Sequence, residues 1–200
     1  MVTAALLIAP RVASAEWQIK PFLGMTFGGA TTLLNPDQGA GEKKLAFGVS
    51  GLLIGEVFGI EGDFGRTPGF FGSSTSDVVQ KRPNHQQLVL QSGVTTLTGN
   101  VVAALPRRIA AYSLRPYVVA GAGLMSASTT TVGSALAVNT NLPAMDVGGG
   151  VTGFLTARLG VSWDLRYFRS IGQHVSPTGD SIGPEELSFW RLNMALAIRY

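Results

Sequence analysis

An alternation of apolar side chains with polar or small ones runs through the last eleven residues of the chain, from Trp190 to Tyr200. Successive side chains of a β-strand point to opposite faces, so this segment is expected to have one apolar face and one polar face. Its length matches the roughly 9–11 residues that a tilted strand needs to cross a bilayer. The rings of Trp190 and Tyr200 stand at its two ends, where membrane interfaces favour aromatic side chains. The pattern therefore predicts a membrane-spanning strand.

The same two-residue period returns in seven earlier segments, and no segment after Ala15 has a convincing helical period. The predicted strands are 17–27, 44–54, 57–66, 87–105, 114–128, 145–155 and 158–169, followed by the closing strand after residue 186. Segment 87–105 is long for one strand, and which of its faces is apolar is ambiguous. A β-bulge near Gly93 or Gly99 would explain this ambiguity.

The connections between these segments alternate in length. The short ones lie near residue 55, at 106–113 and near residue 156, and the long ones are 28–43, 67–86, 129–144 and 170–186. Membrane barrels have this asymmetry, with short turns on the periplasmic side and longer loops outside. The sequence thus predicts an all-β chain that forms a single eight-stranded antiparallel transmembrane barrel.

The composition fits a membrane barrel and argues against several other classes of protein. Charged residues make up 14% of the chain, against about 25% in soluble globular proteins. There is no cysteine, so no disulfide or thiolate metal site is expected, and nothing predicts another metal site or a cofactor. The net charge is only +3 and basic residues cluster only in pairs, so nucleic-acid binding is not expected. A transmembrane helix is not predicted either, because no run of about 18 apolar residues exists.

Residues 1–15 resemble a secretory signal peptide. An apolar stretch from Val2 to Pro10 precedes Ala13, Ser14 and Ala15, a run of small residues that is typical of a cleavage site. The stretch departs from the usual pattern in one respect, because no Lys or Arg precedes it. We therefore expect an exported protein whose residues 16–200 form the barrel domain.

Alternation alone does not decide whether the apolar face meets lipid or a protein core, but the charges do. An Arg that faces lipid near the bilayer centre costs about 2–4 kcal/mol. Because the strand charges share the phase of the small residues, the charged face is expected inside the barrel. The predicted interior charges are Lys20, Glu61, Asp63, Asp164, Arg166, Arg191 and Arg199. The aromatic residues predicted at the lipid interfaces are Trp17, Phe27, Tyr167, Trp190 and Tyr200.

Four internal segments carry short motifs, at residues 59–64 (GIEGDF), 115–117 (RPY), 148–150 (GGG) and 165–168 (LRYF). Together with the terminal strand, they resemble the OmpA-like family of small eight-stranded outer-membrane β-barrels. The resemblance implies a monomer in contact with lipid in the outer membrane of a Gram-negative-type bacterium. It also implies that the C-terminal strand is the signal read by the barrel-insertion machinery.

The predicted interior charges leave two functions open. Buried ions need partners, so we expect a salt-bridge network that plugs the barrel. Eight strands enclose an interior just wide enough for side chains to fill, which favours this structural role. The alternative is a narrow channel that is gated when the ions exchange partners.

A hydrolase on the same scaffold is a further alternative. His174, Ser176 and Glu185 are similar to the His-x-Ser and later Glu of the lipid A deacylases, and these residue types suffice to activate a serine nucleophile. However, Pro177 stands where the deacylases have Asn. A lone His in a polar loop is also more often ordinary solvated surface than a catalytic base.

Basic residues gather at or above the predicted outer rim. They are Lys43, Lys44, Arg66, Lys81, Arg82 and Arg169. Lipopolysaccharide phosphates or other polyanions would suit such a collar, and ordinary solvated charge explains it equally well. We therefore expect a non-catalytic outer-membrane barrel, either structural or binding through its external loops. A soluble lipocalin-like binder is the alternative if residues 1–15 are not a signal peptide.

Overall fold

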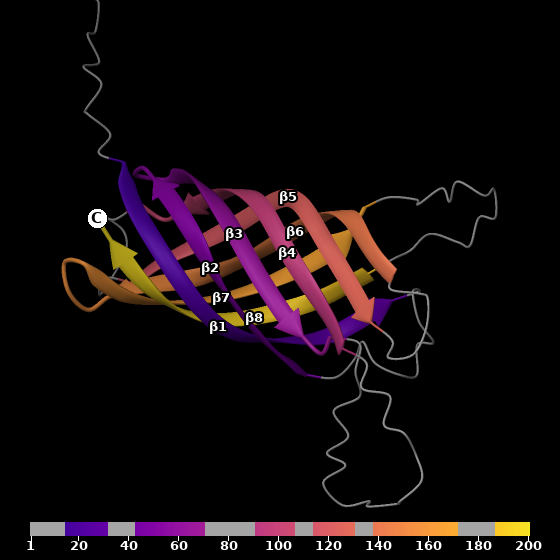
Figure 1. Ribbon diagram of the computed structural model, residues 1–200. Coiled ribbons are helices and arrows are strands. Elements are labelled where there is room, and N and C mark those ends of the chain that lie inside the picture. The colour runs from indigo at the N-terminus through magenta and orange to yellow at the C-terminus, as the bar shows by residue number, and fades with distance from the viewer. Residues whose placement is uncertain (1–14, 32–42, 71–90, 107–113, 131–137, 172–186) are drawn as a thin grey trace, which may run out of the picture.

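The structure is a computed structural model that describes residues 15–31, 43–70, 91–106, 114–130, 138–171 and 187–200. Eight strands form a closed antiparallel barrel, in which each strand pairs with its neighbours in the chain and β1 pairs with β8 (Figure 1). They are β1 (Glu16–Thr31), β2 (Lys44–Ile54), β3 (Phe58–Pro68), β4 (Gln91–Ala104), β5 (Leu114–Thr130), β6 (Val138–Phe154), β7 (Leu159–Ser170) and β8 (Leu187–Arg199). The predicted fold class is confirmed. No helix in the described ranges is long and apolar enough to cross a membrane.

Burial alternates along the strands with the two-residue period of the sequence. In β7, Ser162, Asp164 and Arg166 are buried inside the barrel. Their neighbours Trp163 and Leu165 are exposed on the outer surface. The same alternation runs through β8, whose burial pattern switches at nearly every residue. The barrel is therefore apolar outside and largely polar inside, the reverse of a soluble protein.

The two ends of the barrel differ in their connections. Strand pairs β2–β3, β4–β5 and β6–β7 are joined at one end, here called the turn end, through residues 55–57, 105–113 and 155–158. The beginning of β1 and the end of β8 lie at this end too (Figure 1). The opposite end, the loop end, carries connections 32–43, 69–90, 131–137 and 171–186. Connection 131–137 is shorter than predicted because β5 and β6 extend beyond their predicted limits.

The register of β4 corrects the predicted bulge. This strand pairs without interruption with both β3 and β5, so neither Gly93 nor Gly99 is bulged. Small residues and threonines stand on both faces of β4, which hides its phase in the sequence. The irregularity lies in β1 instead, between Phe27 and Ala30, where the pairing with β8 shifts. Gly28 allows this shift with a φ of 61°, a left-handed conformation that glycine adopts at little cost.

Strand β6 begins at Val138, whereas the sequence predicts residue 145 and places 129–144 in a loop. The added residues pair with β5 and bring Leu142 and Ala144 into an apolar cluster inside the barrel. This part of the strand contains Asn and Pro, which are depleted in strands. Tertiary pairing with β5 therefore overrides a local sequence that points to a loop.

Candidate functional site

Arg166 of β7 is the hub of a buried ionic core at the middle of the barrel. Its Nη1 lies 2.7 Å from Glu61 Oε1, and its Nε lies 3.3 Å from Asp164 Oδ1. Carboxylate oxygens of Asp63 and Asp146 each lie 3.8 Å from the same Nη1. The Arg166 side chain is only 1% exposed. Four carboxylates therefore surround one guanidinium that water does not reach.

Arg191 of β8 is the second buried guanidinium of the core. Its Nη2 donates to Asp63 Oδ1 at 2.6 Å, and its Nη1 donates to Thr96 Oγ1 at 3.2 Å. The guanidinium carbon lies 4.7 Å from the centre of the Phe22 ring and 4.6 Å from that of Phe168. Such ring faces attract a cation, and the attraction strengthens when water is excluded.

Lys20 of β1 is the third cation of the core. Its Nζ lies 3.1 Å from Glu61 Oε2 and 5.0 Å from the centre of the Tyr117 ring. The Tyr117 hydroxyl in turn donates to Asp164 Oδ2 at 3.2 Å and lies 3.2 Å from Ser162 Oγ. Tyr117 thus links the Lys20 side of the core to the Asp164 side.

Two buried amides complete the network. Asn193 Nδ2 donates to Asp164 Oδ1 at 3.0 Å. The Asn100 amide, oriented so that both its ends are satisfied, accepts from Arg166 Nη1 at 3.1 Å and donates to Asp146 Oδ1 at 2.9 Å. The two amides thus satisfy part of the hydrogen-bonding capacity of the buried Asp146, Asp164 and Arg166, which lowers the cost of burying them.

Glycines make the room for these large side chains. A Cβ added at Gly148 would lie 2.9 Å from the Arg166 Cα and nearer still to the Leu165 carbonyl oxygen. A Cβ at Gly65 would press on Arg191 Nη1. Both glycines face the interior. The inward face therefore combines glycines with charged residues, because the large charged side chains need the space that the glycines leave.

The core carries more negative than positive groups. Within the described residues, its carboxylates are Glu61, Asp63, Asp146 and Asp164, and its cations are Lys20, Arg166 and Arg191. Asp146 has the weakest ionic contact of the four carboxylates, because its nearest guanidinium nitrogen is 3.8 Å away. The core thus holds four carboxyl groups and three basic side chains.

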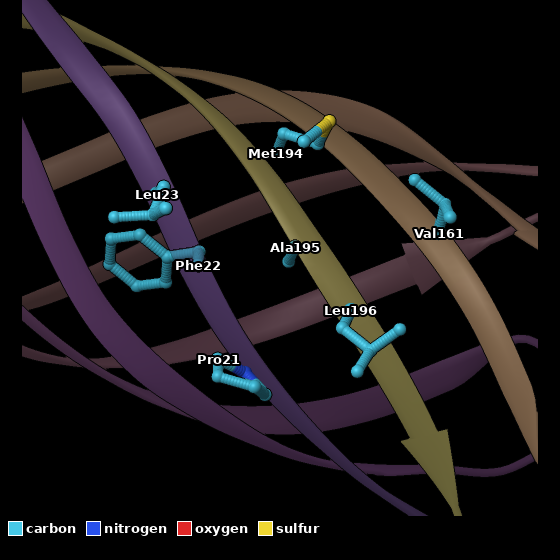
Figure 2. Close-up of a pocket in the computed structure, with 7 residues that line it drawn as sticks. All are labelled: Pro21, Phe22, Leu23, Val161, Met194, Ala195 and Leu196. Atoms are coloured by element: carbon cyan, nitrogen blue, oxygen red, sulfur yellow. The ribbon is translucent and has the colours of Figure 1, made fainter.

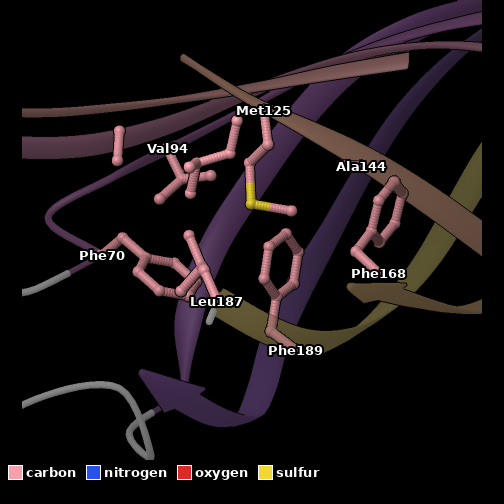
Figure 3. Close-up of a cluster of buried hydrophobic side chains, with 9 residues drawn as sticks. Phe70, Val94, Met125, Ala144, Phe168, Leu187 and Phe189 are labelled. Carbon is pink, nitrogen blue, oxygen red and sulfur yellow. The ribbon is translucent and has the colours of Figure 1, made fainter. Parts of the chain in front are cut away.

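Apolar layers lie on either side of the ionic core. The layer toward the loop end is a cluster of nine buried residues: Phe70, Val94, Met125, Ala127, Leu142, Ala144, Phe168, Leu187 and Phe189. Figure 3 draws all nine and labels all but Ala127 and Leu142. Within it the rings of Phe168 and Phe189 stack at 5.2 Å. The layer toward the turn end contains Leu52, Ile54, Val102, Ala104, Tyr117 and Val119. The ions therefore lie between two apolar clusters.

The outer surface is an apolar belt with aromatic rings near both ends. Trp17 and Tyr200 are exposed at the turn end, where the Tyr200 amide donates to the Trp17 carbonyl at 3.0 Å. Toward the loop end, the ring centres of Tyr167 and Trp190 lie 5.0 Å apart, and Phe27 pairs with Trp190 across the strands. Between these two aromatic zones the exposed side chains are chiefly Leu, Ile, Val, Phe and Met. This arrangement is the one a lipid bilayer selects.

No known protein family and no curated protein matches the sequence. Solved structures do match over nearly the whole chain. Neisserial surface protein A has 12% identity and a TM-score of 0.62, over 92% of this chain and 97% of that one. The N-terminal barrel of Pseudomonas aeruginosa OprF (11%, TM-score 0.54) covers 92% and 97%, and a major outer membrane protein of Thermus thermophilus (13%, TM-score 0.53) covers 94% and 100%. The fold is that of a small outer-membrane β-barrel.

Six of the seven predicted interior charges meet in the ionic core of this outer-membrane barrel, and Arg199 does not. Arg199 lies at the turn end with its side chain 26% exposed. There its Nε and Nη2 donate to the Ala157 carbonyl at 2.8 and 2.5 Å, and its Nη1 lies 3.6 Å from Glu16 Oε1. Arg199 is therefore not part of the predicted interior network, because it lies beyond Arg191 and Asn193 on β8, where the strand has passed the core and reached the mouth of the barrel.

The predicted basic collar divides into exposed and buried residues. Lys43, Arg66 and Arg169 are exposed near the loop end of the barrel wall. Lys44 is buried and faces inward, which corrects its predicted place on the collar. The reason is its phase in β2, since Lys44 shares the inward face with Ala46 and Ser50. Lys81 and Arg82 lie outside the described residues.

The hydrolase candidates His174, Ser176 and Glu185 also lie outside the described residues, as does the predicted signal segment up to residue 14. Within the described ranges, no group of three His, Cys, Asp or Glu side chains is placed to hold a metal ion.

Sequence reasoning missed four polar side chains of the core: Asn100, Tyr117, Asp146 and Asn193. Asp146 shares its phase with Gly148, Gly150 and Thr152, opposite Met145 and Val147, so counting phase through β6 would have placed it inside. Asn100 lies in β4, whose phase becomes clear only through its pairing with β5. Neutral side chains carry no charge cost that would assign them to a face.

Proposed function

We propose that the protein is a non-conducting, non-catalytic integral outer-membrane barrel that supports external binding loops. The observation that carries this proposal is the burial of the ionic core. Arg166 and Arg191 are each 1% exposed and lie between two apolar clusters, which supports an interior filled by side chains. A filled interior also holds the strand ends in fixed positions, which suits a platform for loops.

Residence in the outer membrane of a Gram-negative-type bacterium is part of this proposal. The apolar belt, the two aromatic zones and the likeness in fold to outer-membrane proteins support it. We further propose export through residues 1–15, insertion guided by β8, a monomeric state and a turn end that faces the periplasm. Cell fractionation with heat-modifiable gel mobility tests this location. Protein found only in the periplasm or cytosol would contradict it.

Planar-bilayer recording tests the non-conducting interior. Purified protein is expected to give silent traces, because the core has no open aqueous path. Asp164→Ala and Arg166→Ala should be recorded beside it, since each removes part of the plug. Reproducible conductance steps in the unmodified protein that change in these variants would support the narrow channel instead.

The binding role is proposed for the loop end. Exposed Lys43, Arg66 and Arg169, together with Lys81 and Arg82 in the chain between β3 and β4, would attract phosphate groups of lipopolysaccharide. Replacing Lys81 and Arg82 by Ala should weaken binding of the reconstituted protein to purified lipopolysaccharide, and binding should fall with added salt. Replacing Ser73 and Ser74 in the same connection is the neutral control. Equal binding by all three proteins would contradict a charge-based role for this connection.

The hydrolase alternative rests on the similarity of His174, Ser176 and Glu185 to the lipid A deacylases. Mass spectrometry of lipid A from cells that express the protein distinguishes it from a binding protein. Loss of an acyl chain that is restored by Ser176→Ala would establish the hydrolase. Unchanged lipid A in both strains agrees with the non-catalytic proposal.

A further inference from the structure

The seam between β1 and β8 is incompletely paired in its half toward the turn end. Gln18 and Ile19 pair with Arg199 and Ile198, and the described ladder resumes only at Phe22. Pro21 lies in this gap and has no amide hydrogen to donate. On its other side β1 remains paired with β2 through the same residues, so the interruption is confined to the seam that closes the barrel.

A hollow of about 360 Å³ lies on the outer surface over this interruption. Figure 2 shows its walls, which come from β1, β7 and β8. The lining residues are Pro21, Phe22, Leu23, Val161, Met194, Ala195 and Leu196. Leu23, Met194 and Leu196 are exposed on the belt, whereas Phe22 and Ala195 face inward and form the floor. The volume is many times the roughly 30 Å³ that one water molecule occupies in the liquid.

The lining selects the chemistry of the occupant. Its side chains are hydrocarbon apart from the thioether of Met194, so a polar headgroup would find no partner there. The hollow also opens on the apolar belt, which is the lipid-facing surface. Leaving it empty would forfeit dispersion contacts along its whole lining. An alkyl chain is the occupant that matches both the lining and the place.

The height of the hollow on the barrel selects the leaflet. Val161 lies two residues from the start of β7, and Leu196 lies three residues from the end of β8. Both of these strand ends are at the turn end, which the proposed orientation places on the periplasmic side. That side of an outer membrane is the phospholipid leaflet, whereas lipopolysaccharide occupies the other.

We propose that this groove is a binding site for one acyl chain of a periplasmic-leaflet phospholipid. The chain fills the hollow and covers the interrupted part of the β1–β8 seam from the lipid side. This inference rests on the proposed membrane location and orientation, but it goes beyond them, since a barrel in a membrane need not hold any lipid chain at a fixed place.

Trp163 provides a reporter for the test. It pairs with Met194 across β7 and β8 and is exposed on the belt, so its ring lies beside the groove. The protein with Trp17→Phe and Trp190→Phe keeps this single tryptophan. It would be reconstituted in phosphatidylcholine vesicles that contain rising fractions of phosphatidylcholine with brominated chains. Val161→Phe fills the groove, and Val101→Phe on the far side of the belt is the matched control.

A bound chain should make quenching of Trp163 rise more steeply than the fraction of brominated lipid. At low fractions the quenching should be at least about twofold greater than in Val161→Phe, with Val101→Phe unchanged, because filling the hollow removes the favourable contacts. Native mass spectrometry should show one phospholipid retained by the unmodified protein and by Val101→Phe. Leu196→Phe serves in place of Val161→Phe if the latter loses its heat-modifiable mobility.

Three results would overturn the site. The first is proportional quenching with the same slope in all variants, which shows bulk lipid contact only. The second is retention of lipopolysaccharide in place of phospholipid, and the third is a dimer that buries the groove. Absence of quenching even in fully brominated vesicles has a different meaning, because it contradicts the membrane location itself.

Discussion

The guanidinium of Arg166 reaches across the barrel to Glu61, and the 2.7 Å contact joins β7 to β3 on the opposite wall. Each of these strands is four strands from the other in either direction around the closed sheet. The contact therefore spans the interior of the barrel at the level of the core. It also makes the two walls depend on each other, which leads to the first prediction.

Removing both partners of this contact should destabilise the barrel by less than the sum of the two single losses. Glu61→Gln leaves Arg166 and Lys20 short of a counter-charge, and a single loss of this kind in a buried pair costs about 3–5 kcal/mol. Arg166→Met should cost a similar amount for the opposite reason. The double variant should cost clearly less than the sum. Urea unfolding of the protein in lipid vesicles gives the three free energies, and strictly additive values would show that the pair is not coupled.

Because the core has more carboxylates than cations, substitution of Asp146 should destabilise it less than substitution of any other core carboxylate. Asp146→Asn balances three carboxylates against three cations and keeps an oxygen toward Arg166. Its effect on the free energy of unfolding is expected to stay within about 1 kcal/mol. Asp63→Asn is the contrasting variant, because it removes the 2.6 Å partner of Arg191 and should cost about 3–5 kcal/mol. Equal losses in the two variants would argue against an unbalanced core.

Gly148→Ala should destabilise the barrel by about 1–3 kcal/mol, as forced overpacking of a filled interior does. The added methyl would meet the backbone of Leu165 and Arg166, which cannot move without shifting β7. Gly62→Ala is the matched control, since a Cβ there meets nothing within 4 Å. The temperature at which each variant loses its heat-modifiable gel mobility would rank the two variants. The idea fails if Gly62→Ala proves as harmful as Gly148→Ala.

Substitution of Arg199 at the turn end should lower the free energy of unfolding by a smaller amount. Arg199→Ala loses two hydrogen bonds to the Ala157 carbonyl and the contact with the Phe154 ring at 4.4 Å. A cost of about 1–2 kcal/mol is expected for partly exposed bonds of this kind. Arg199→Lys keeps the charge near Glu16 but not the planar fork, so it should recover only part of the loss. Full recovery by Lys would assign the whole effect to charge.

The sequence predicts most reliably those strands whose two faces differ strongly in character. In β7 and β8 bulky apolar residues alternate with Asp, Arg or Asn, and both boundaries and phase follow from that contrast. Contrast is lost in β4, where Thr, Gly and Ala fill both faces, and in the first part of β6, which contains Asn and Pro. There the partner strand sets the register, and a single sequence does not show which residues of the partner lie opposite.

The candidate site follows the same division. The charges of the core are predictable because the cost of facing lipid assigns them to the inside. Their pairing is not predictable, since it depends on the tilt and stagger of the closed sheet. Prediction of a side chain's position is least accurate at strand ends, as Lys44 and Arg199 show. There a shift of one or two residues along the strand decides whether the side chain lies in the core, on the wall or at the mouth of the barrel.

Arg191 and Asp63 are 128 residues apart in the chain, and their contact exists only once the first and last strands have met. Glu61 and Asp63 of β3 likewise find their cations on β1, β7 and β8. A partly closed sheet would hold unpaired ions against hydrocarbon, and a one-residue slip would turn them outward to the lipid. The buried charges therefore penalise every unfinished or misaligned barrel, so that assembly in the membrane is driven to completion in one register.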